Sequence, residues 1–193
     1  MIPEIRKKFN FKFSDQLYQE YLDDLNSVLK YPTDFRICET PLFLNRDLTS
    51  ELIKACDDIT EQIQKEDFLK RSEDAIPQHL KVPNNFEHPL FLQLDFAITK
   101  TDHKYIPKLI ELQAFPTLYG FQVYLSDTIK KHFDIPVGFN NYFSGLNKTT
   151  YRNLLTECII AKHDPVNVIL LEIEPERQKT RIDFAATEEL TGL

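Results

Sequence analysis

Two stretches of alternating apolar and polar residues, separated by a short polar turn, constrain the fold of this chain most strongly. Residues 90–99 are LFLQLDFAIT and residues 105–115 are YIPKLIELQAF, with KTDHK between them. A period of two places successive side chains on opposite faces of a β-strand. We therefore predict strands near residues 90–99 and 106–114, paired as an antiparallel hairpin centred near His103.

The predicted hairpin carries polar residues on one face, and two of them are carboxylates. Gln93 and Asp95 share the polar face of the first strand. On the second strand, the alternation gives two sets: Lys108, Ile110 and Leu112 on one face, and Leu109, Glu111 and Gln113 on the other. An even register places Asp95 opposite Glu111, with Cβ atoms about 5 Å apart. The same register places Gln93 opposite Gln113, so that the four polar side chains form one cluster.

The pairing of two carboxylates requires a compensating charge. At this separation they repel by roughly 4 kcal/mol at an effective dielectric constant of about 20. Magnesium prefers oxygen ligands and is commonly held by one or two carboxylates together with substrate phosphates. Asp95, Glu111 and the amide oxygen of Gln113 fit that ligand set. The alternative is a solvated sheet surface whose carboxylates pair with nearby lysines: Lys100, Lys104 or Lys108.

The hairpin sequence resembles the metal-binding element of circularly permuted ATP-grasp ligases, the group that contains glutathionylspermidine synthetase. In that family one strand has Arg-x-Asp-Phe and a later one has Glu-Tyr-Asn-Ala-Asp-x-Pro-Thr, where this chain has QLDF and ELQAFPT. The resemblance implies that Asp95 and Glu111 bind magnesium and that Gln113 replaces the family Asn. Pro116 and Thr117 correspond to the Pro-Thr pair.

This chain departs from the family pattern at three positions. Gln93 stands where the family has a phosphate-binding Arg, and an amide lacks the charged bidentate fork of a guanidinium. Gln113 is one methylene longer than Asn, and the segment before Pro116 is one residue shorter. The resemblance then implies a weak magnesium site that depends on nucleotide phosphates for further oxygens, with Gln93 as a contact to the nucleotide.

The second half of the chain alternates helical and strand patterns. A helix follows Gly120, another is capped by Asn147 or Thr149, and VNVILLEI at residues 166–173 predicts a buried parallel strand. Ligands of open α/β sheets bind beyond the carboxyl ends of strands. The basic residues that follow are therefore candidate contacts to an anionic group: Arg177, Lys179 and Arg181, with Gln178 and Thr180 beside them. The alternative is a solvated helix start.

The first 89 residues have a helical pattern. Ser14 can cap one helix, a second begins near Thr49 or Ser50, and prolines and asparagines predict a loop at residues 72–89. We predict a helical N-terminal segment with a linker loop over residues 1–89 and an α/β portion over residues 90–193, packed as one globular unit. The predicted class is a three-layer α/β fold with a mixed sheet and helices on both faces.

Composition narrows the functional classes. The formal net charge of −7, with no long Lys/Arg run, argues against nucleic acid as a partner. No run of 18 apolar residues and no signal-peptide core are found, so we expect a cytoplasmic, soluble protein with no membrane partner. Three widely spaced cysteines without a CxxC pair and five histidines without zinc spacing carry no assigned chemistry.

The ATP-binding half of the expected active site is missing from the sequence. No G-x-G-x-x-G or G-K-[ST] motif is present. In the family, the glycine-rich loop and the ATP-binding lysines follow the metal-binding element. The resemblance thus implies the N-terminal part of an ADP-forming carboxylate–amine ligase, inactive as this 193-residue chain. Its partners would be a small carboxylate or amine substrate and a C-terminal ATP-grasp portion that binds ATP.

Two other functions remain open from the sequence. The first is a non-catalytic relative of the same fold that binds a ligand or a partner. The second is a glycosidase in which Asp95 and Glu111 form an acid/base pair. Nothing else in the sequence favours the glycosidase.

Overall fold

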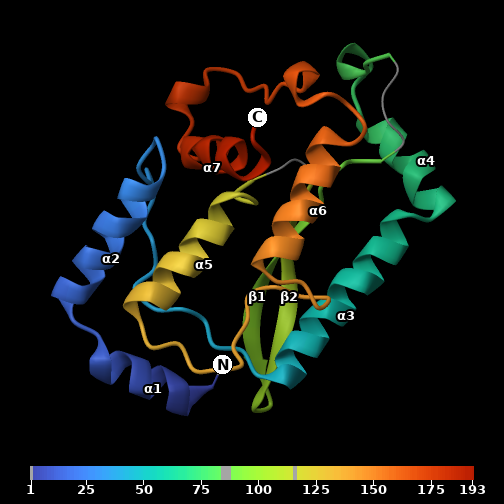
Figure 1. The fold of residues 1–193 in the computed structure, drawn as a ribbon. Coiled ribbons are helices and arrows are strands. Elements are labelled where there is room, and N and C mark those ends of the chain that lie inside the picture. The colour runs from blue at the N-terminus through green and yellow to red at the C-terminus, as the bar shows by residue number, and fades with distance from the viewer. Residues whose placement is uncertain (1, 84–87, 115–116) are drawn as a thin grey trace. The chain divides into compact units, whose positions relative to one another are not determined.

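The computed structural model describes residues 2–83, 88–114 and 117–193. It combines helices with one small sheet (Figure 1). The elements are α1 (Pro3–Lys12), α2 (Asp15–Val28), α3 (Arg46–Ile63), α4 (Glu66–Ala75), η1 (Gln78–Leu80), β1 (Gln93–Thr101), β2 (Lys104–Gln113), α5 (Phe121–His132), α6 (Lys148–Ile160), η2 (Pro165–Asn167), η3 (Pro175–Arg177) and α7 (Arg181–Thr191), where η marks a 3₁₀ turn. Pro116, one of the residues matched to the ligase family, lies outside the described residues.

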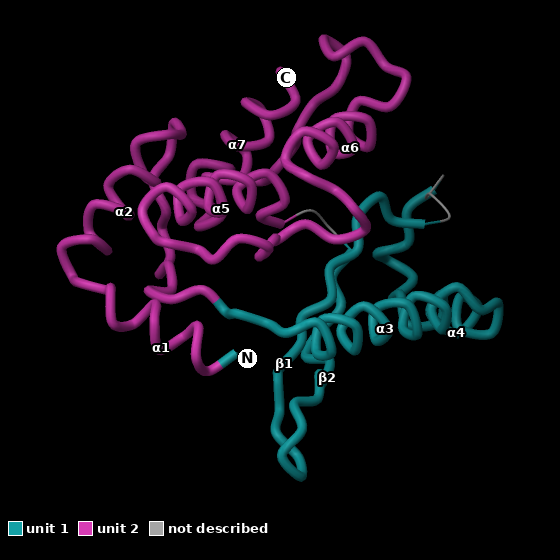
Figure 2. The backbone as a smooth tube through the Cα atoms, turned by 60° about the horizontal axis from the view of Figure 1, so that its bottom comes forward, with its two compact units in different colours: residues 1–2, 42–116 teal, residues 3–41, 117–193 magenta. Residues whose placement is uncertain are grey.

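The chain forms two compact units (Figure 2). The first contains Met1–Ile2 and Leu42–Pro116, and the second contains Pro3–Pro41 and Thr117–Leu193. The segment boundary expected between residues 89 and 90 lies within the first unit. The predicted metal ligands therefore belong to the first unit, and the predicted basic anion contacts belong to the second.

The structure confirms the antiparallel hairpin and its even register. Asp95 pairs with Glu111, and Gln93 pairs with Gln113. The strands are joined by Asp102 and His103, which both have positive φ, at 46° and 67°. Positive φ at both central residues matches the right-handed twist of the flanking strands and is typical of two-residue hairpin turns.

A β-bulge interrupts the ladder next to the paired carboxylates. Phe96 pairs with Leu109 instead of Ile110, so Ile110 is the extra residue of the second strand. The prediction was therefore wrong for Lys108 and Leu109. Lys108 lies opposite Ala97 and shares the face of the carboxylates, whereas Leu109 has moved to the apolar face opposite Phe96. A bulge shifts the alternation by one residue and twists the strand locally.

The remainder of the first unit is helical. Its α3 lies against β2 (Figure 2). We predicted that this helix begins near Thr49 or Ser50, but it begins at Arg46, because the side chain of Asn45 accepts a hydrogen bond from the backbone N–H of Leu48 at 2.9 Å. The loop predicted over residues 72–89 is shorter at its start, since α4 continues to Ala75. Residues 84–87 of that loop lie outside the described residues.

The second unit has a well-buried helical core. As predicted, Ser14 caps α2 by accepting a hydrogen bond from the N–H of Leu17. The helices α2 and α5 lie side by side, and α7 contacts both α5 and α6 (Figure 1). The largest fully buried side chains all belong to this unit: Tyr21, Leu25, Phe121, Val123 and Ile182. Burial of each contributes about 1.5–3 kcal/mol, so the unit has its own source of stability.

The strand predicted at residues 166–173 is absent. These residues form η2 and an irregular segment, and the side chains of Val166, Ile169, Leu171 and Ile173 are at least 80% exposed. A β-favouring composition produces a strand only where a neighbouring strand completes the hydrogen-bond ladder. Within the described residues, the sheet consists of β1 and β2 alone.

One further property concerns the length of the helices. None of those in the described residues is long and apolar enough to cross a membrane.

Candidate metal centre

The candidate centre lies at the open end of the hairpin, where the two strands leave the bulge. Asp95 is half-buried and Glu111 is exposed. The Nε2 of Gln93 donates to Oδ1 of Asp95 at 3.2 Å, and the Nε2 of Gln113 donates to Oε1 of Glu111. Each carboxylate is therefore oriented by the amide two residues earlier or later on its own strand, which shares its face of the sheet.

The cluster lacks a positive charge within the described part of the chain. No described lysine, arginine or histidine forms an ion pair with Asp95 or Glu111, although Lys108 projects from the same face. The Oε1 of Gln93 is buried and has no hydrogen-bond partner there. A buried acceptor without a donor is costly, and a cation beside it would remove that cost.

The protein side chains alone supply few metal ligands. Among the described residues, no group of three or more His, Cys, Asp or Glu side chains is placed to hold a metal ion. The structure brings two carboxylates and two amides together. This set suits a hard cation that keeps several water or phosphate oxygens in its coordination shell.

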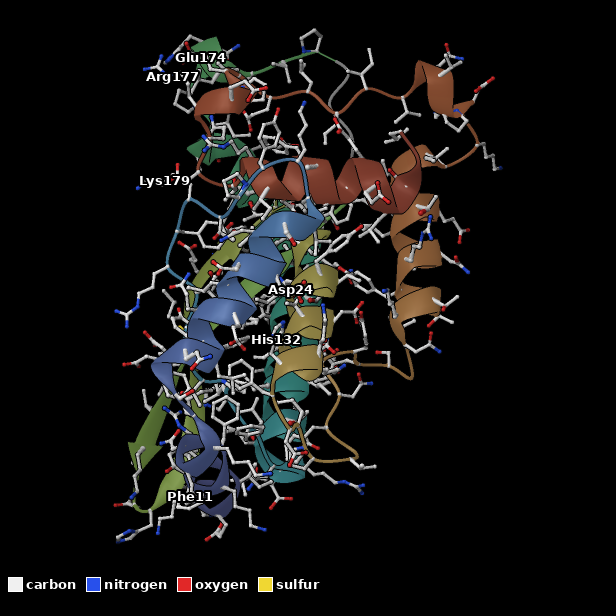
Figure 3. The ribbon with its side chains drawn as sticks, turned by 60° about the vertical axis from the view of Figure 1, so that its left-hand side comes forward. Phe11, Asp24, His132, Glu174, Arg177 and Lys179 are labelled. Carbon is white, nitrogen blue, oxygen red and sulfur yellow. The ribbon has the colours of Figure 1, made fainter. Side chains whose placement is uncertain are left out.

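The predicted basic contacts are largely engaged by local carboxylates (Figure 3). Arg177 forms a two-pronged ion pair with Glu174, with Nη1 at 3.0 and 3.1 Å from the two carboxylate oxygens. Arg181 donates to the backbone carbonyl of Glu176 at 2.9 Å and lies 3.9 Å from Asp34. Lys179 is exposed. Of these three residues, only Lys179 forms no ion pair within the described part of the chain.

Arg181 also belongs to an aromatic and acidic contact that sequence reasoning missed. Its guanidinium lies 5.9 Å from the ring centroid of Tyr31, and the hydroxyl of Tyr31 donates to Glu176 at 2.6 Å. These contacts tie η3 and the start of α7 to the segment that follows α2. They favour a structural role for Arg181, which is the solvated alternative considered from the sequence.

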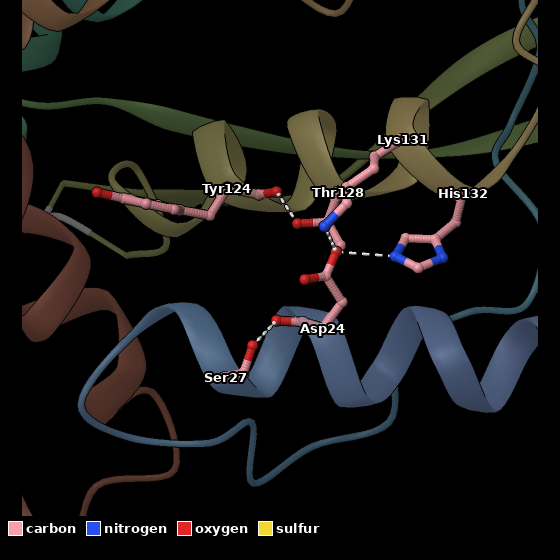
Figure 4. A network of polar contacts seen from close by, with 6 residues as sticks. All are labelled: Asp24, Ser27, Tyr124, Thr128, Lys131 and His132. Atoms are coloured by element: carbon pink, nitrogen blue, oxygen red, sulfur yellow. Dashed lines mark hydrogen bonds and ion pairs between the residues drawn. The ribbon is translucent and has the colours of Figure 1, made fainter.

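The sequence also gave no sign of a second polar cluster, between α2 and α5 (Figure 4). The Oδ2 of Asp24 lies 2.8 Å from Nζ of Lys131 and 2.8 Å from Nε2 of His132. The hydrogen bond from Lys131, and then that with His132, lowers the pKa of Asp24. The ring of His132 also meets the edge of Tyr21. Sequence separations above 100 residues leave no local signal for such a cluster.

Buried Asp183 on α7 is the other ionisable group that the sequence did not single out. Only 5% of the residue is exposed, and burial raises its pKa, while backbone N–H groups from residues 118–121 act in the opposite direction. Its carboxylate accepts a hydrogen bond from the N–H of Phe121 at 2.7 Å, at the beginning of α5.

Comparison with known proteins does not add a family assignment. No protein-family model, no curated protein and no solved structure matches this chain.

Proposed function

We propose that this chain is the N-terminal part of an ATP-grasp-like, ADP-forming carboxylate–amine ligase, and that its hairpin carries the magnesium ligands. The observation that supports this best is the register, which sets Asp95 opposite Glu111 in a cluster without a cation in the described residues. The resemblance of QLDF and ELQAFPT to the metal-binding element of circularly permuted ATP-grasp ligases suggested the same residues.

The donor set fits magnesium. Asp95 and Glu111 would supply carboxylate oxygens, and Gln113 would supply an amide oxygen once its Nε2 no longer faces Glu111. The buried Oε1 of Gln93 is a further oxygen without a donor. Bound magnesium would neutralise negative charge on the nucleotide phosphates during phosphoryl transfer.

Gln93 limits what the hairpin can do by itself. Its amide already donates to Asp95, and it carries no charge to offset a transferring phosphoryl group. In the second unit, the proposed contacts to an anionic group are Arg177, Lys179 and Arg181. Lys179 fits that role best, because it is the one without an ion pair in the described residues. We expect the 193-residue chain to bind divalent metal weakly and to catalyse no ligation.

The three-layer α/β fold with a mixed sheet stays a proposal for this chain. Each strand of the two-stranded hairpin has a ladder edge that is unpaired within the described residues. The apolar residues 166–173 are also exposed. An isolated hairpin is marginally stable, and further strands from a C-terminal ATP-grasp portion would complete the sheet and bury these groups.

Calorimetric titration with Mn²⁺, in the absence and presence of ADP, tests the magnesium site. We expect weak binding to the chain alone and at least tenfold tighter binding when ADP adds phosphate oxygens, a gain of about 1.4 kcal/mol. Asp95→Asn should abolish both, because it removes the charge and leaves the shape of the side chain almost unchanged.

Asp102→Asn is the matched control for this titration. Asp102 is an exposed carboxylate of the same hairpin, in the turn, and asparagine tolerates its positive φ of 46°. Its replacement should leave Mn²⁺ binding unchanged. Equal losses in Asp95→Asn and Asp102→Asn would mean that manganese binds the general negative charge of the hairpin, and the ligase proposal would lose its support.

The exposed apolar segment favours a second candidate function, a non-catalytic relative that binds a partner. Residues 166–173 present five aliphatic side chains to solvent and lie outside the hairpin cluster. This function predicts that no Mn²⁺ binding depends on Asp95, while Leu171→Lys weakens association with the C-terminal portion. Titration of Mn²⁺ therefore separates the two functions.

A further inference from the structure

The first helix of the second unit presents two phenylalanines on opposite sides. Phe9 and Phe11 are two residues apart on α1, and successive residues of an α-helix are about 100° apart, so their side chains point in nearly opposite directions. Phe9 is buried and stacks on Phe133 at the end of α5, with ring centroids 5.0 Å apart. Phe11 is 91% exposed (Figure 3). The inner face of α1 therefore belongs to the core, and the outer face holds a large aromatic ring in solvent.

The exposed face around Phe11 is basic. Lys7 precedes Phe11 by four residues and Lys8 by three, so both lie beside it on the helix surface. Both lysines are exposed, and neither forms an ion pair within the described residues. Lys12 follows Phe11 and pairs with Asp134 at 2.6 Å, with both side chains largely exposed. The ring of Phe11 is thus flanked by ammonium groups of its own helix.

This positive charge is concentrated on α1. The helix holds four basic residues and one acidic residue, a formal charge of +3, in a chain whose formal charge is −7. Charges more than about 8 Å apart are largely screened at physiological ionic strength. An anionic surface in contact with α1 therefore interacts with the charge of this helix and little with the acidic remainder of the chain.

An anionic membrane surface fits this face better than an acidic protein does. Helices that lie in the plane of a membrane place apolar side chains below the headgroups and basic side chains among them. Lysine side chains are long enough to reach the headgroups while their stems stay beside the ring. A protein partner would have to provide a pocket for Phe11 and carboxylates at matching positions, whereas a bilayer provides both everywhere on its surface. Four basic residues on an amphipathic helix also reach the size of clusters that recognise anionic lipids.

We propose that α1 docks this chain on anionic lipid surfaces, with Phe11 inserted below the headgroups and Lys7, Lys8 and Lys12 in contact with their anionic groups. The expectation of no membrane partner came from the absence of a spanning segment in the sequence, and a helix that lies on the surface needs none. The docking is reversible, because one ring and a few charges bind far more weakly than a spanning helix. The docking face lies in the second unit and is independent of the magnesium site of the hairpin.

Tryptophan fluorescence tests the insertion, because the chain contains no tryptophan of its own. Phe11→Trp places a single reporter on the exposed face of α1. With phosphatidylcholine vesicles that contain about 20% phosphatidylserine, its emission should shift to shorter wavelength and be quenched by lipids brominated on their acyl chains. Vesicles of phosphatidylcholine alone should give no shift. Val166→Trp is the matched control, since Val166 in η2 is 81% exposed, and it should give no shift with either vesicle.

Cosedimentation with the same vesicles measures the affinity of the parent and its variants. Lys7→Gln and Lys8→Gln should each weaken binding about fivefold, the effect of one positive charge at an anionic surface. Phe11→Ser should weaken binding about tenfold or more, because it removes the inserted ring. Lys162→Gln makes the same change in net charge at an exposed position outside α1 and should leave binding unchanged. Circular dichroism checks that these surface substitutions leave the fold intact.

Three results would overturn the proposal. The first is no binding to the phosphatidylserine vesicles. The second is a loss of binding in Lys162→Gln as large as that in Lys7→Gln, which would indicate the general charge of the chain. The third is binding without a fluorescence shift in Phe11→Trp, or with an equal shift in Val166→Trp. A basic face that binds anions without inserting its ring would fit an acidic protein partner instead of a bilayer.

Discussion

The two compact units of this chain differ in how much they bury. Phe43 and Leu48 are the buried apolar residues found in the first unit, whereas the other twelve of the fourteen in the described residues belong to the second. The second unit is held by helices that share a core. The first depends on a hairpin whose side chains are half-buried or exposed, so its stability comes mainly from the ladder and local contacts.

The candidate metal ligands lie in the less buried unit. A site that is weakly supported by its own surroundings gains most from a bound ligand or an additional protein layer, since binding to the folded form stabilises it by mass action. The contrast between the units therefore shows that the first unit would gain more stability from a bound ligand than the second.

The largest expected loss of stability comes from a cavity in the core of the second unit. Leu25 is fully buried, and Leu25→Ala should cost about 2–5 kcal/mol, through lost burial and the cavity left behind. The matched change in the first unit is Leu94→Ala on the half-buried face of β1, with an expected cost of about 1 kcal/mol. Urea unfolding of both variants measures the difference. Similar costs would mean that the hairpin has a core after all.

A smaller effect concerns the contact between α5 and α7. Gly120→Ala should destabilise the second unit by about 1–3 kcal/mol, because the new Cβ would lie 2.9 Å from the backbone N of Thr187, which cannot rotate away. Gly138→Ala serves as a contrasting control, since nothing lies within 4 Å of its Cβ position and only its positive φ of 95° is strained. Unfolding midpoints in urea distinguish the two causes. A larger loss in Gly120→Ala indicates a steric clash, and a larger loss in Gly138→Ala indicates that backbone conformation matters more.

Acid should affect the two buried or half-buried aspartates of the second unit in opposite directions. Ion pairing with Lys131 and His132 lowers the pKa of Asp24, so its stabilising effect is present above the unfolded pKa and is lost as the pH falls through the folded value. Burial raises the pKa of Asp183, so its contribution is fully present below the unfolded pKa and is lost as the pH rises through the folded value.

The measurement for this prediction is the melting temperature of the parent and of two variants, Asp24→Asn and Asp183→Asn, between about pH 5 and pH 3. On acidification, the difference in melting temperature between the parent and Asp24→Asn should shrink. The melting temperature of the parent should rise relative to that of Asp183→Asn. Tyr151, whose ring lies near Asp183, stays neutral throughout this range, because its pKa of about 12 lies far above it. Parallel trends in both variants would contradict the assignment of causes.

The smallest expected effect is on the hairpin. Asp95→Asn should change the free energy of unfolding by less than about 0.5 kcal/mol, because no described cation pairs with this carboxylate. Thermal unfolding without metal gives the value. A melting temperature lower by several degrees would identify Asp95 as a structural residue, and the hairpin would then contribute more to stability than its low burial indicates.

The hairpin was predictable because its information is local. The alternation of residues 90–99 and 106–114 and the short polar turn fix both the pairing and its register. The bulge at Ile110 was not predictable from the same pattern, because one inserted residue changes the faces of Lys108 and Leu109 without interrupting the β-favouring composition. The helix cap at Ser14 was predicted correctly, since a cap also acts within one turn. Of the two predicted caps of α6, Asn147 and Thr149, the structure has Asn147.

Contacts between distant residues were missed for the opposite reason. Asp183 meets Phe121 across 62 residues, and Asp24 meets His132 across 108. The composition of residues 166–173 favours a strand, but a strand also needs a neighbour, and in the described residues no neighbour is present. Local patterns thus predicted single elements and one adjacent pair. They did not predict which elements are joined by buried charge.

The exposed aliphatic stretch at residues 166–173 limits the concentration at which the free chain stays in solution. Short segments of high β-propensity and low charge associate edge to edge once one strand provides a template, so their loss from solution depends steeply on concentration. Glu172 and Glu174 are the charges that oppose such stacking. Acid that protonates these two carboxylates removes the repulsion, and the chain then precipitates at lower concentrations than at neutral pH. The exposed aliphatic side chains of this stretch therefore make the free chain prone to self-association.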